Sequence, residues 1–189
     1  KKLRVLLVDG DPRWEYRYLR NAILRDRHIR FSCFLTSVGA RLGGEGNVPI
    51  RGFPPDEKSL FEYDILILGD VPRGALSETQ LRNVRKFVEE KGGSLIVIAG
   101  EKHMPYEYRA TPLEAGLPVT MGARREEVNE FAPFRWELTQ AGRRDPLMRM
   151  DPDPARNDRI WRELPGMYWH TAAERARPGA IVLAVNARR

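Results

Sequence analysis

Short apolar runs that end in an acidic residue or a glycine recur along the first hundred residues and constrain the fold most. The clearest runs cover residues 3–10, 64–70 and 94–100. Apolar runs without polar alternation are typical of strands buried on both faces of a parallel sheet. We therefore predict three such strands and expect the first to be central. A fourth strand, rich in aromatic and β-branched residues, is predicted over residues 29–36.

Helical patterns alternate with these runs. Helices are predicted from about Trp14 to Asp26, with Asp11 or Pro12 near the start, and from Asp56 to Tyr63. A capping box over residues 77–80 opens a third helix, which ends at two glycines, residues 92–93. The alternation predicts βαβ units that wind right-handed into a parallel sheet with helices on both faces.

The pattern weakens after Glu101. Only Phe134–Leu138 and Ile181–Val185 read as later strands, and a helix is predicted over Asn157–Leu164. The stretch Gly39–Pro55 is too long for a routine connection, so we expect it to be functional or mobile. We expect one domain over residues 3–189, an excised and C-terminally incomplete part of a longer protein.

Composition excludes several classes of protein. With 42% hydrophobic and 31% charged residues among 189, the chain is typical of one soluble globular domain. No apolar stretch approaches the roughly 18–20 residues of a membrane-spanning helix, so membrane contact is expected only through segments outside this chain. The net charge of +6 comes from scattered Arg residues, often beside acids, which favours a solvated surface over nucleic-acid binding.

The single cysteine limits thiol chemistry. Cys33 stands between Phe31 and Phe34 in a predicted strand, where a buried, inert thiol is expected. The three histidines, His28, His103 and His170, lack metal-ligand spacing, and neither a Walker sequence nor Gly-x-Gly-x-x-Gly is present. We predict no bound metal and no cofactor.

Charged side chains collect where the predicted strands end, the edge at which open parallel sheets bind ligands. They form a candidate binding site of Asp9, Asp11, Arg13, Asp70, Arg73, Glu101, Lys102 and His103. Its acids could hold Mg²⁺ through oxygen ligands. The favoured alternative is that Asp9 and Asp11 cap the following helix and that Asp70 pairs with Arg13 or Arg73.

Aromatic side chains are expected to pack rather than to bind a cofactor. Trp14, Tyr16 and Tyr18 open the first predicted helix, where the default expectation is packing over the strand-end cleft. In the second half, we expect the segment Tyr168–His170 to lie in the core or to anchor an interface.

Four segments together resemble a known family. They cover residues 6–20, 63–70, 92–100, and 111–113 with 117–119. These segments are similar to the class I glutamine amidotransferase-like domain of bacterial membrane-anchored proteins that carry a von Willebrand factor A module. The match spans residues 3–119, and the order Asp, Pro, Trp, Tyr after the first strand is its most specific part. The resemblance implies a flavodoxin-like three-layer αβα sandwich and descent from enzymes that release ammonia from glutamine with a Cys-His-Glu triad.

The sequence departs from that family at the nucleophile. The matching turn, which follows the predicted strand at residues 94–100, is Glu101–Pro105 and contains no Cys, Ser or Thr. Glutaminase activity is therefore not expected, and the leading hypothesis is a non-catalytic binding or interaction module, a pseudoenzyme, in a larger bacterial cell-envelope protein. One alternative is a hydrolase of changed chemistry that uses Asp9, Asp70, Glu101 and His103. A second is a receiver-like, metal-binding signalling domain.

The C-terminal half is the expected contact surface. It holds Phe134, Trp136, Trp161, Tyr168 and Trp169, and no helix follows the apolar run at residues 181–185. Exposed strand edges and apolar patches favour contact with a protein partner or a second copy. The alternative is that these aromatic residues fold back and complete a monomer's core.

Overall fold

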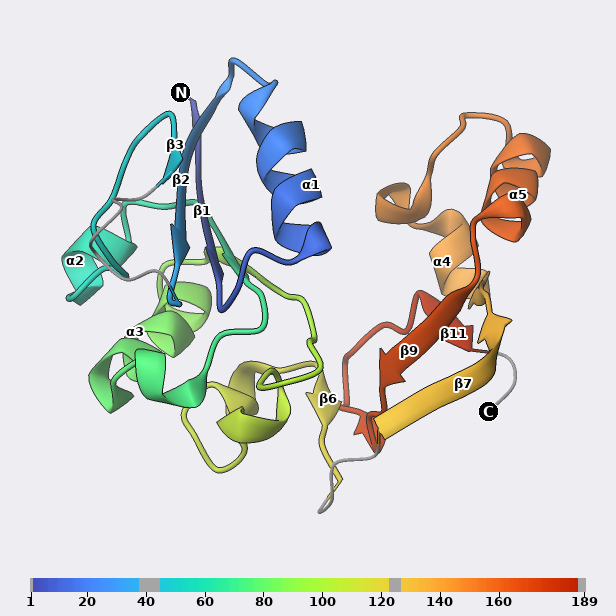
Figure 1. Cartoon of the computed structure of the whole chain (residues 1–189). Coiled ribbons are helices and arrows are strands. Elements are labelled where there is room, and N and C mark those ends of the chain that lie inside the picture. Colours follow the sequence, from blue (N-terminus) through green and yellow to red (C-terminus); the bar gives the residue numbers. More distant parts are fainter. Residues whose placement is uncertain (1, 38–44, 123–126, 187–189) are drawn as a thin grey trace. The chain divides into compact units, whose positions relative to one another are not determined.

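The computed structural model describes residues 2–37, 45–122 and 127–186, and gives only the backbone of residues 127–131 (Figure 1). The sequence predicts a single domain over residues 3–189. The chain divides into two compact units, Lys1–Leu117 and Pro118–Arg189, which we call unit 1 and unit 2. Each unit is described by itself.

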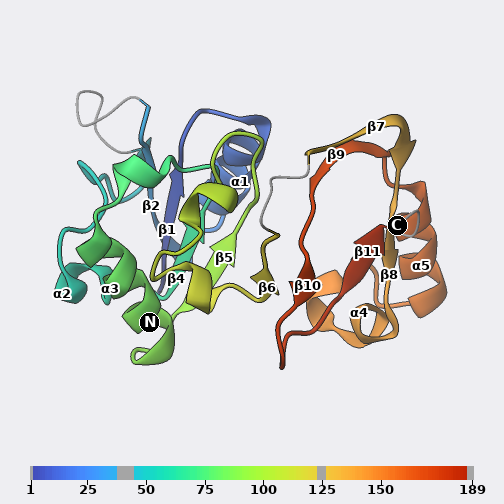
Figure 2. The same ribbon diagram turned by 90° about the horizontal axis from the view of Figure 1, so that it is seen from below.

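Unit 1 is built on a five-stranded, mostly parallel sheet. The parallel strands are β1 (Leu3–Asp9), β2 (Ile29–Leu35), β4 (Ile65–Leu68) and β5 (Ser94–Val97), and the short β3 (Glu45–Gly46) runs antiparallel beside β2. The strand order is β3-β2-β1-β4-β5, and Figure 2 shows β1 between β2 and β4. The predictions of an α/β fold and of a central first strand are confirmed.

Helices cover both faces of this sheet because successive side chains of a strand point to opposite faces. Val5 and Leu7 of β1 pack with Tyr16 of α1 (Trp14–Leu24) in one core cluster. Leu6 and Val8 of the same strand belong to a second cluster. That cluster also contains residues of α2 (Glu57–Leu60) and α3 (Glu78–Glu89).

The predicted capping box is present at the start of α3. The Ser77 hydroxyl accepts a hydrogen bond from the Gln80 backbone N–H, and the Gln80 side chain accepts one from the Ser77 N–H. After the helix, Gly92 has φ +73°, a backbone conformation that favours glycine. Local sequence therefore fixes both ends of this helix.

The connections after β4 and β5 complete the core of unit 1. The 3₁₀ turn η2 (Arg73–Ala75) follows β4, and η3 (Tyr106–Tyr108) and η4 (Glu114–Gly116) follow β5. Part of the predicted loop at Gly39–Pro55, residues 39–44, lies outside the described residues. The later part of the loop packs inward, because Ile50 and Phe53 contact the core cluster that contains residues of α2 and α3.

Three antiparallel strand pairs occur in the described residues of unit 2. They are β6 (Val119–Thr120) with β10 (Arg175–Ala176), β7 (Glu127–Phe134) with β9 (Met167–Thr171), and β8 (Trp136–Leu138) with β11 (Ala184–Asn186). Its helices are α4 (Gln140–Arg144), η5 (Pro146–Met148) and α5 (Pro154–Glu163). In the described part of the chain, no helix is long and apolar enough to cross a membrane.

Both late strands differ from the prediction. The strand predicted at 134–138 is divided, because β7 ends at Phe134 and β8 begins at Trp136. The strand predicted at 181–185 shrinks to β11, and Ile181 is 70% exposed. The Thr139 hydroxyl donates to the carbonyls of Val182 and Leu183, the Leu183 carbonyl also accepts the Thr139 backbone N–H at 3.0 Å, and the pairing of β11 with β8 ends at Ala184 and Leu138. The helix predicted at 157–164 begins earlier, at Pro154, because Asp153 caps it.

Candidate functional site

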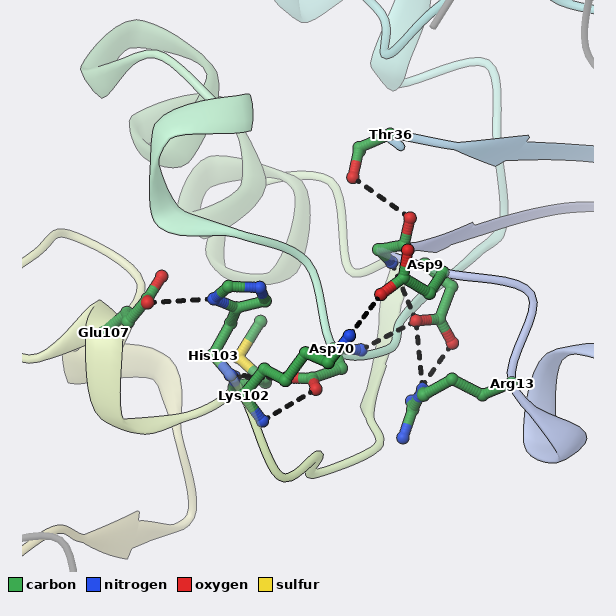
Figure 3. A network of polar contacts seen from close by, with 10 residues as sticks. Asp9, Arg13, Thr36, Asp70, Lys102, His103 and Glu107 are labelled. Carbon is green, nitrogen blue, oxygen red and sulfur yellow. Dashed lines mark hydrogen bonds and ion pairs between the residues drawn. The ribbon is translucent and has the colours of Figure 1, made fainter. Parts of the chain in front are cut away.

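The site lies at the carboxyl ends of β1, β4 and β5, where the chain turns out of the sheet (Figure 3). The turns after these three strands bring together Asp9, Asp70 and the segment 102–104. Ligands of open parallel sheets bind at this edge, near the point where the strand order reverses. The sequence prediction placed the site at the same edge.

Asp9 is a buried carboxylate held by a cation and by backbone donors. Its two oxygens accept hydrogen bonds from Arg13 Nε at 3.2 Å and Arg13 Nη2 at 3.0 Å. The backbone N–H groups of Gly10 and Asp70 donate to Oδ1 at 2.7 Å and 3.0 Å. This two-pronged guanidinium pair compensates the cost of burying the charge.

Asp70 is buried as well, and it organises the turn after β5. Its carboxylate accepts three backbone hydrogen bonds, from Lys102 at 3.0 Å and from His103 and Met104 at 2.7 Å each. Burial raises the pKa of Asp70. The three N–H donors and the nearby charge of Arg13 together lower it by more than burial raises it, so the pKa lies below its usual value. The side chain is therefore a fixed anion that holds the turn in place.

An exposed ion pair and an exposed hydrogen-bonded pair of side chains lie beside these acids (Figure 3). Lys102 Nζ is 2.8 Å from Asp11 Oδ2, and its hydrogen bond to that carboxylate lowers the pKa of Asp11. His103 Nδ1 is 2.8 Å from Glu107 Oε1, while Glu107 Oε2 accepts the backbone N–H of Arg73 at 3.0 Å. The pKa of Glu107 is raised by burial but lowered more by these two partners. In each pair, a side chain near the strand ends is bound by another side chain of the same chain.

Glycines make the close approach of the two buried acids possible. A Cβ atom on Gly69 would lie 2.1 Å from Asp9 Oδ2, and one on Gly100 would lie 2.1 Å from Asp70 Cγ. Only a residue without a side chain fits at either position. Gly69 and Gly100, each near the end of a predicted apolar run, thus leave room for the carboxylates.

The sequence-based prediction of which groups the acids bind is partly wrong. The N-cap residue of α1 is Arg13, without a side-chain cap, so neither Asp9 nor Asp11 caps the helix. The hydrogen-bond partners of Asp70 are backbone groups, and Arg73 instead contacts the Leu76 carbonyl and Glu78. Glu101 lies in the same turn as these backbone groups and is exposed.

The aromatic residues of α1 do not all pack as expected. Tyr16 is buried and donates its hydroxyl hydrogen bond to Glu45. Trp14 and Tyr18, however, are each 69% exposed and stack on one another, with Arg17 over the Trp14 ring. The expectation of packing over the cleft is wrong for these two, because residues four apart share one helix face and this face points to solvent.

This arrangement offers charge and hydrogen bonding but no nucleophile at the turn. Among the described residues, no three His, Cys, Asp or Glu side chains are placed to hold a metal ion. Cys33 is buried, and burial raises the pKa of its thiol, so the reactive thiolate is disfavoured. His103, oriented by Glu107, is the group best placed for proton transfer.

Sequence reasoning missed Glu107. Its signal was its spacing of four residues from His103, but the expected turn gave no reason to assume helical geometry. A cavity of about 300 Å³ in unit 2 was also missed. Its lining combines aromatic and charged side chains from β8, α4 and α5, namely Trp136, Glu137, Leu138, Arg143, Asp158, Trp161 and Arg162.

The aromatic residues of unit 2 divide between core and surface. Phe134 is buried and packs edge-on against Trp136 and His170, with ring centroids 5.3 Å and 5.1 Å apart. Tyr168, the neighbour of Trp169 in β9, is 59% exposed. Phe134 therefore completes the core of the unit, as one expectation states, whereas Tyr168 is available for contact at the surface, as the other states.

Comparisons of the chain with protein-family models, with curated proteins and with solved structures find no match.

Proposed function

We propose that this chain is a non-catalytic, amidotransferase-like interaction module of a larger bacterial cell-envelope protein whose membrane anchor lies outside these 189 residues. The observation that carries the proposal is the internally closed network at the strand ends. Asp9 and Asp70 are buried and bonded to Arg13 and to backbone N–H groups, so these buried carboxylates already have their partners. A catalytic acid or base needs an oxygen or nitrogen left for its substrate.

The sheet order supports a flavodoxin-like ancestry. The parallel strands lie in the order β2-β1-β4-β5, which matches the first four strands of the flavodoxin-like order. In glutamine-hydrolysing relatives of this architecture, the cysteine nucleophile stands on the turn after the strand equivalent to β5. Here that turn is occupied by backbone N–H groups bound to Asp70. The turn has a structural role instead of a catalytic one.

Unit 2 is the proposed contact surface for a protein partner or a second copy. It carries most of the exposed large apolar side chains in the described residues: Leu147, Met150, Met167, Tyr168, Ile181, Val182 and Val185. Contiguous exposed apolar patches mark interaction sites, and Met167 with Tyr168, like Ile181 with Val182, are exposed neighbours in the sequence. Nucleic acid is not a proposed partner, because the excess of Arg is dispersed along the chain.

A direct assay tests the absence of catalysis. The chain is incubated with glutamine, released ammonia is measured with a coupled dehydrogenase, and labelling by a thiol-reactive glutamine analogue is followed by mass spectrometry. We expect neither ammonia nor a mass increase. Glutamine turnover that disappears in Cys33→Ala would contradict the proposal, because it would make the buried thiol a working nucleophile.

Contact through unit 2 is tested with Tyr168→Asp and the matched control Tyr18→Asp in unit 1. Both side chains are strongly exposed, so both variants should stay folded by circular dichroism. If unit 2 mediates self-association, Tyr168→Asp should lower the mass measured by light scattering while Tyr18→Asp does not. Equal effects of both substitutions would count against a specific surface on unit 2.

One observation favours a hydrolase as a second candidate function. The pair of His103 with Glu107 at 2.8 Å resembles the base and orienting acid of hydrolytic triads, with water as the required nucleophile. Ester hydrolysis lost in His103→Ala and retained in Glu101→Gln would support this candidate. A receiver-like role would instead require Mg²⁺ binding by calorimetry that is lost in Asp70→Ala.

A further inference from the structure

The cavity of unit 2 has a volume of about 300 Å³, at the lower end of the range for small-molecule sites in proteins. Its wall is formed by β8, α4 and α5, which lie next to one another in unit 2 (Figure 2). Asp158, Trp161 and Arg162 line it from α5, because residues three and four apart share one helix face. Trp136 lines it from β8 and Arg143 from α4. These residues differ from the exposed apolar side chains assigned above to protein contact.

The two tryptophans are fixed in the wall with their polar hydrogens already bonded. Trp161 Nε1 donates to the Met148 carbonyl at 2.9 Å. Trp136 Nε1 donates to Met167 Sδ at 2.8 Å, and the Trp136 ring packs edge-on with Phe134. An indole has a single polar hydrogen, so each ring offers a ligand its apolar surface. Because the surrounding contacts hold both rings in place, a ligand does not have to order them.

The charged side chains of the cavity supply donors and acceptors without a net charge. Two arginines, Arg143 and Arg162, stand with two acids, Glu137 and Asp158. Asp158 connects the arginines: its Oδ1 is 3.5 Å from Arg143 Nε, and its backbone carbonyl accepts a hydrogen bond from Arg162 Nε at 3.1 Å. A guanidinium carries five N–H donors and a carboxylate accepts about four hydrogen bonds, so these contacts use only part of what the side chains can bind. A fully charged ligand of either sign would meet a like charge in this wall.

We propose that this cavity binds the uncharged pyranose ring of a sugar. A pyranose has faces made of C–H groups and a rim of hydroxyl groups. The C–H groups pack on the ring surfaces of Trp136 and Trp161, whose faces carry partial negative charge. Each hydroxyl both donates and accepts, so the rim bonds to carboxylate and guanidinium alike, through Asp158 and the two arginines.

A zwitterion such as an amino acid is the nearest alternative, because the lining carries both signs of charge. The Arg143 and Asp158 side chains, however, are 55% and 40% exposed, and ion pairs at such exposure contribute little. Stacking on indole and hydrogen bonding to hydroxyl groups do not require an unscreened charge. The exposure of the pair therefore favours the neutral ring, and binding should be nearly independent of salt.

The four tryptophans of the unchanged chain report on the site by NMR, since each indole N–H gives one signal in a proton–nitrogen correlation spectrum. The signals are assigned by replacing one tryptophan at a time with phenylalanine. The probes are the methyl glycosides of glucose, galactose, mannose and N-acetylglucosamine. At least one should shift the signals of Trp136 and Trp161 saturably, with a Kd on the order of 1 mM for a ligand of this size. Trp14, at 69% exposure, is the internal control for non-specific stacking and should not shift.

Asp158→Ala separates recognition from folding. The half-exposed carboxylate contributes little to stability, so the variant should have nearly the urea midpoint of the unchanged chain but bind the active glycoside about tenfold more weakly. Arg156→Ala, at an exposed position of α5 outside the lining, should bind like the unchanged chain. Undiminished binding by Asp158→Ala would overturn the proposal, as would four glycosides that leave Trp136 and Trp161 unshifted or shift Trp14 equally. Binding of L-phenylalanine that weakens with added salt, without glycoside binding, would overturn it in favour of the zwitterion.

Discussion

At the scale of single residues, the carboxylate of Asp70 is the clearest example of a charged group at the candidate site that stabilises the structure. A buried anion with three backbone donors stabilises the turn that supplies them, and a charged hydrogen bond contributes more than a neutral one. Asp70→Asn keeps the shape but turns part of the acceptor into a donor. We expect a loss of about 2–3 kcal/mol in the free energy of unfolding, measured by urea denaturation. Glu101→Gln, exposed in the same turn, should change it by less than about 0.5 kcal/mol.

The lowered pKa of Asp70 predicts a pH dependence of its own. A carboxyl whose pKa is lower in the folded state adds stability at pH values above its unfolded pKa of about 3.9. That stability is lost as the pH falls through the lowered folded value. Urea midpoints measured from pH 6 downward should therefore converge for the unchanged chain and Asp70→Asn below about pH 4. Parallel curves would show that Asp70 is not a bound anion.

Sequence reasoning located the acids at the strand ends but not their partners. Asp9 and Asp70 follow apolar runs, and the ends of parallel strands must meet at one edge, so their proximity is a matter of topology. The donors to Asp70 are backbone N–H groups of residues 102–104, whose direction depends on how that turn folds against the core. Side-chain patterns carry no signal for such a partner.

At the scale of elements, the glycine that follows β5 in the sequence, Gly100, is as important as the Asp70 carboxylate that it accommodates. Gly100→Ala would bring a methyl group to 2.1 Å from Asp70 Cγ, with buried structure around it. We expect a destabilisation of about 1–3 kcal/mol by denaturant unfolding. Gly74→Ala in η2 is the matched control, since a Cβ there meets nothing within 4 Å and should be nearly neutral. Equal losses in both would argue against crowding as the cause.

The capping box of α3 allows a second test at this scale. Ser77→Ala removes the hydroxyl that accepts the Gln80 N–H and should cost about 1 kcal/mol of stability. Ser77→Asp supplies another acceptor at the same place and should recover most of that loss. If the aspartate variant is as unstable as the alanine variant, the cap is not the stabilising contact.

Elements with their own local signals were predictable, and those that depend on pairing were not. The buried strands and α3 carry an apolar run or a capping box within their own residues. β9, by contrast, exists through its pairing with β7 across a separation of more than thirty residues, and the sequence at Met167–Thr171 gave only an aromatic cluster. Likewise, the run at 181–185 is apolar enough for a strand, but Thr139 binds its carbonyls.

At the scale of the whole molecule, the division into two units predicts two separable stabilities. Phe87 is fully buried in unit 1, where it contacts Phe61 edge-on at 6.3 Å. Phe87→Ala should cost unit 1 about 3–5 kcal/mol. Three of the four tryptophans, Trp136, Trp161 and Trp169, belong to unit 2, and the fourth is largely exposed already in the folded state. The change in tryptophan fluorescence on unfolding therefore reports mainly on unit 2.

If each unit is held by its own core, Phe87→Ala should speed hydrogen exchange in residues 1–117 and leave the fluorescence transition in place. The reciprocal variant is Leu138→Ala, at a buried position of unit 2, and it should move the fluorescence transition while exchange in the sheet of unit 1 stays slow. Segment-resolved exchange by mass spectrometry distinguishes these results, since stability can differ between parts of one chain. Both variants shifting both readouts equally would mean that the 189 residues unfold as one cooperative body, as the single-domain prediction requires.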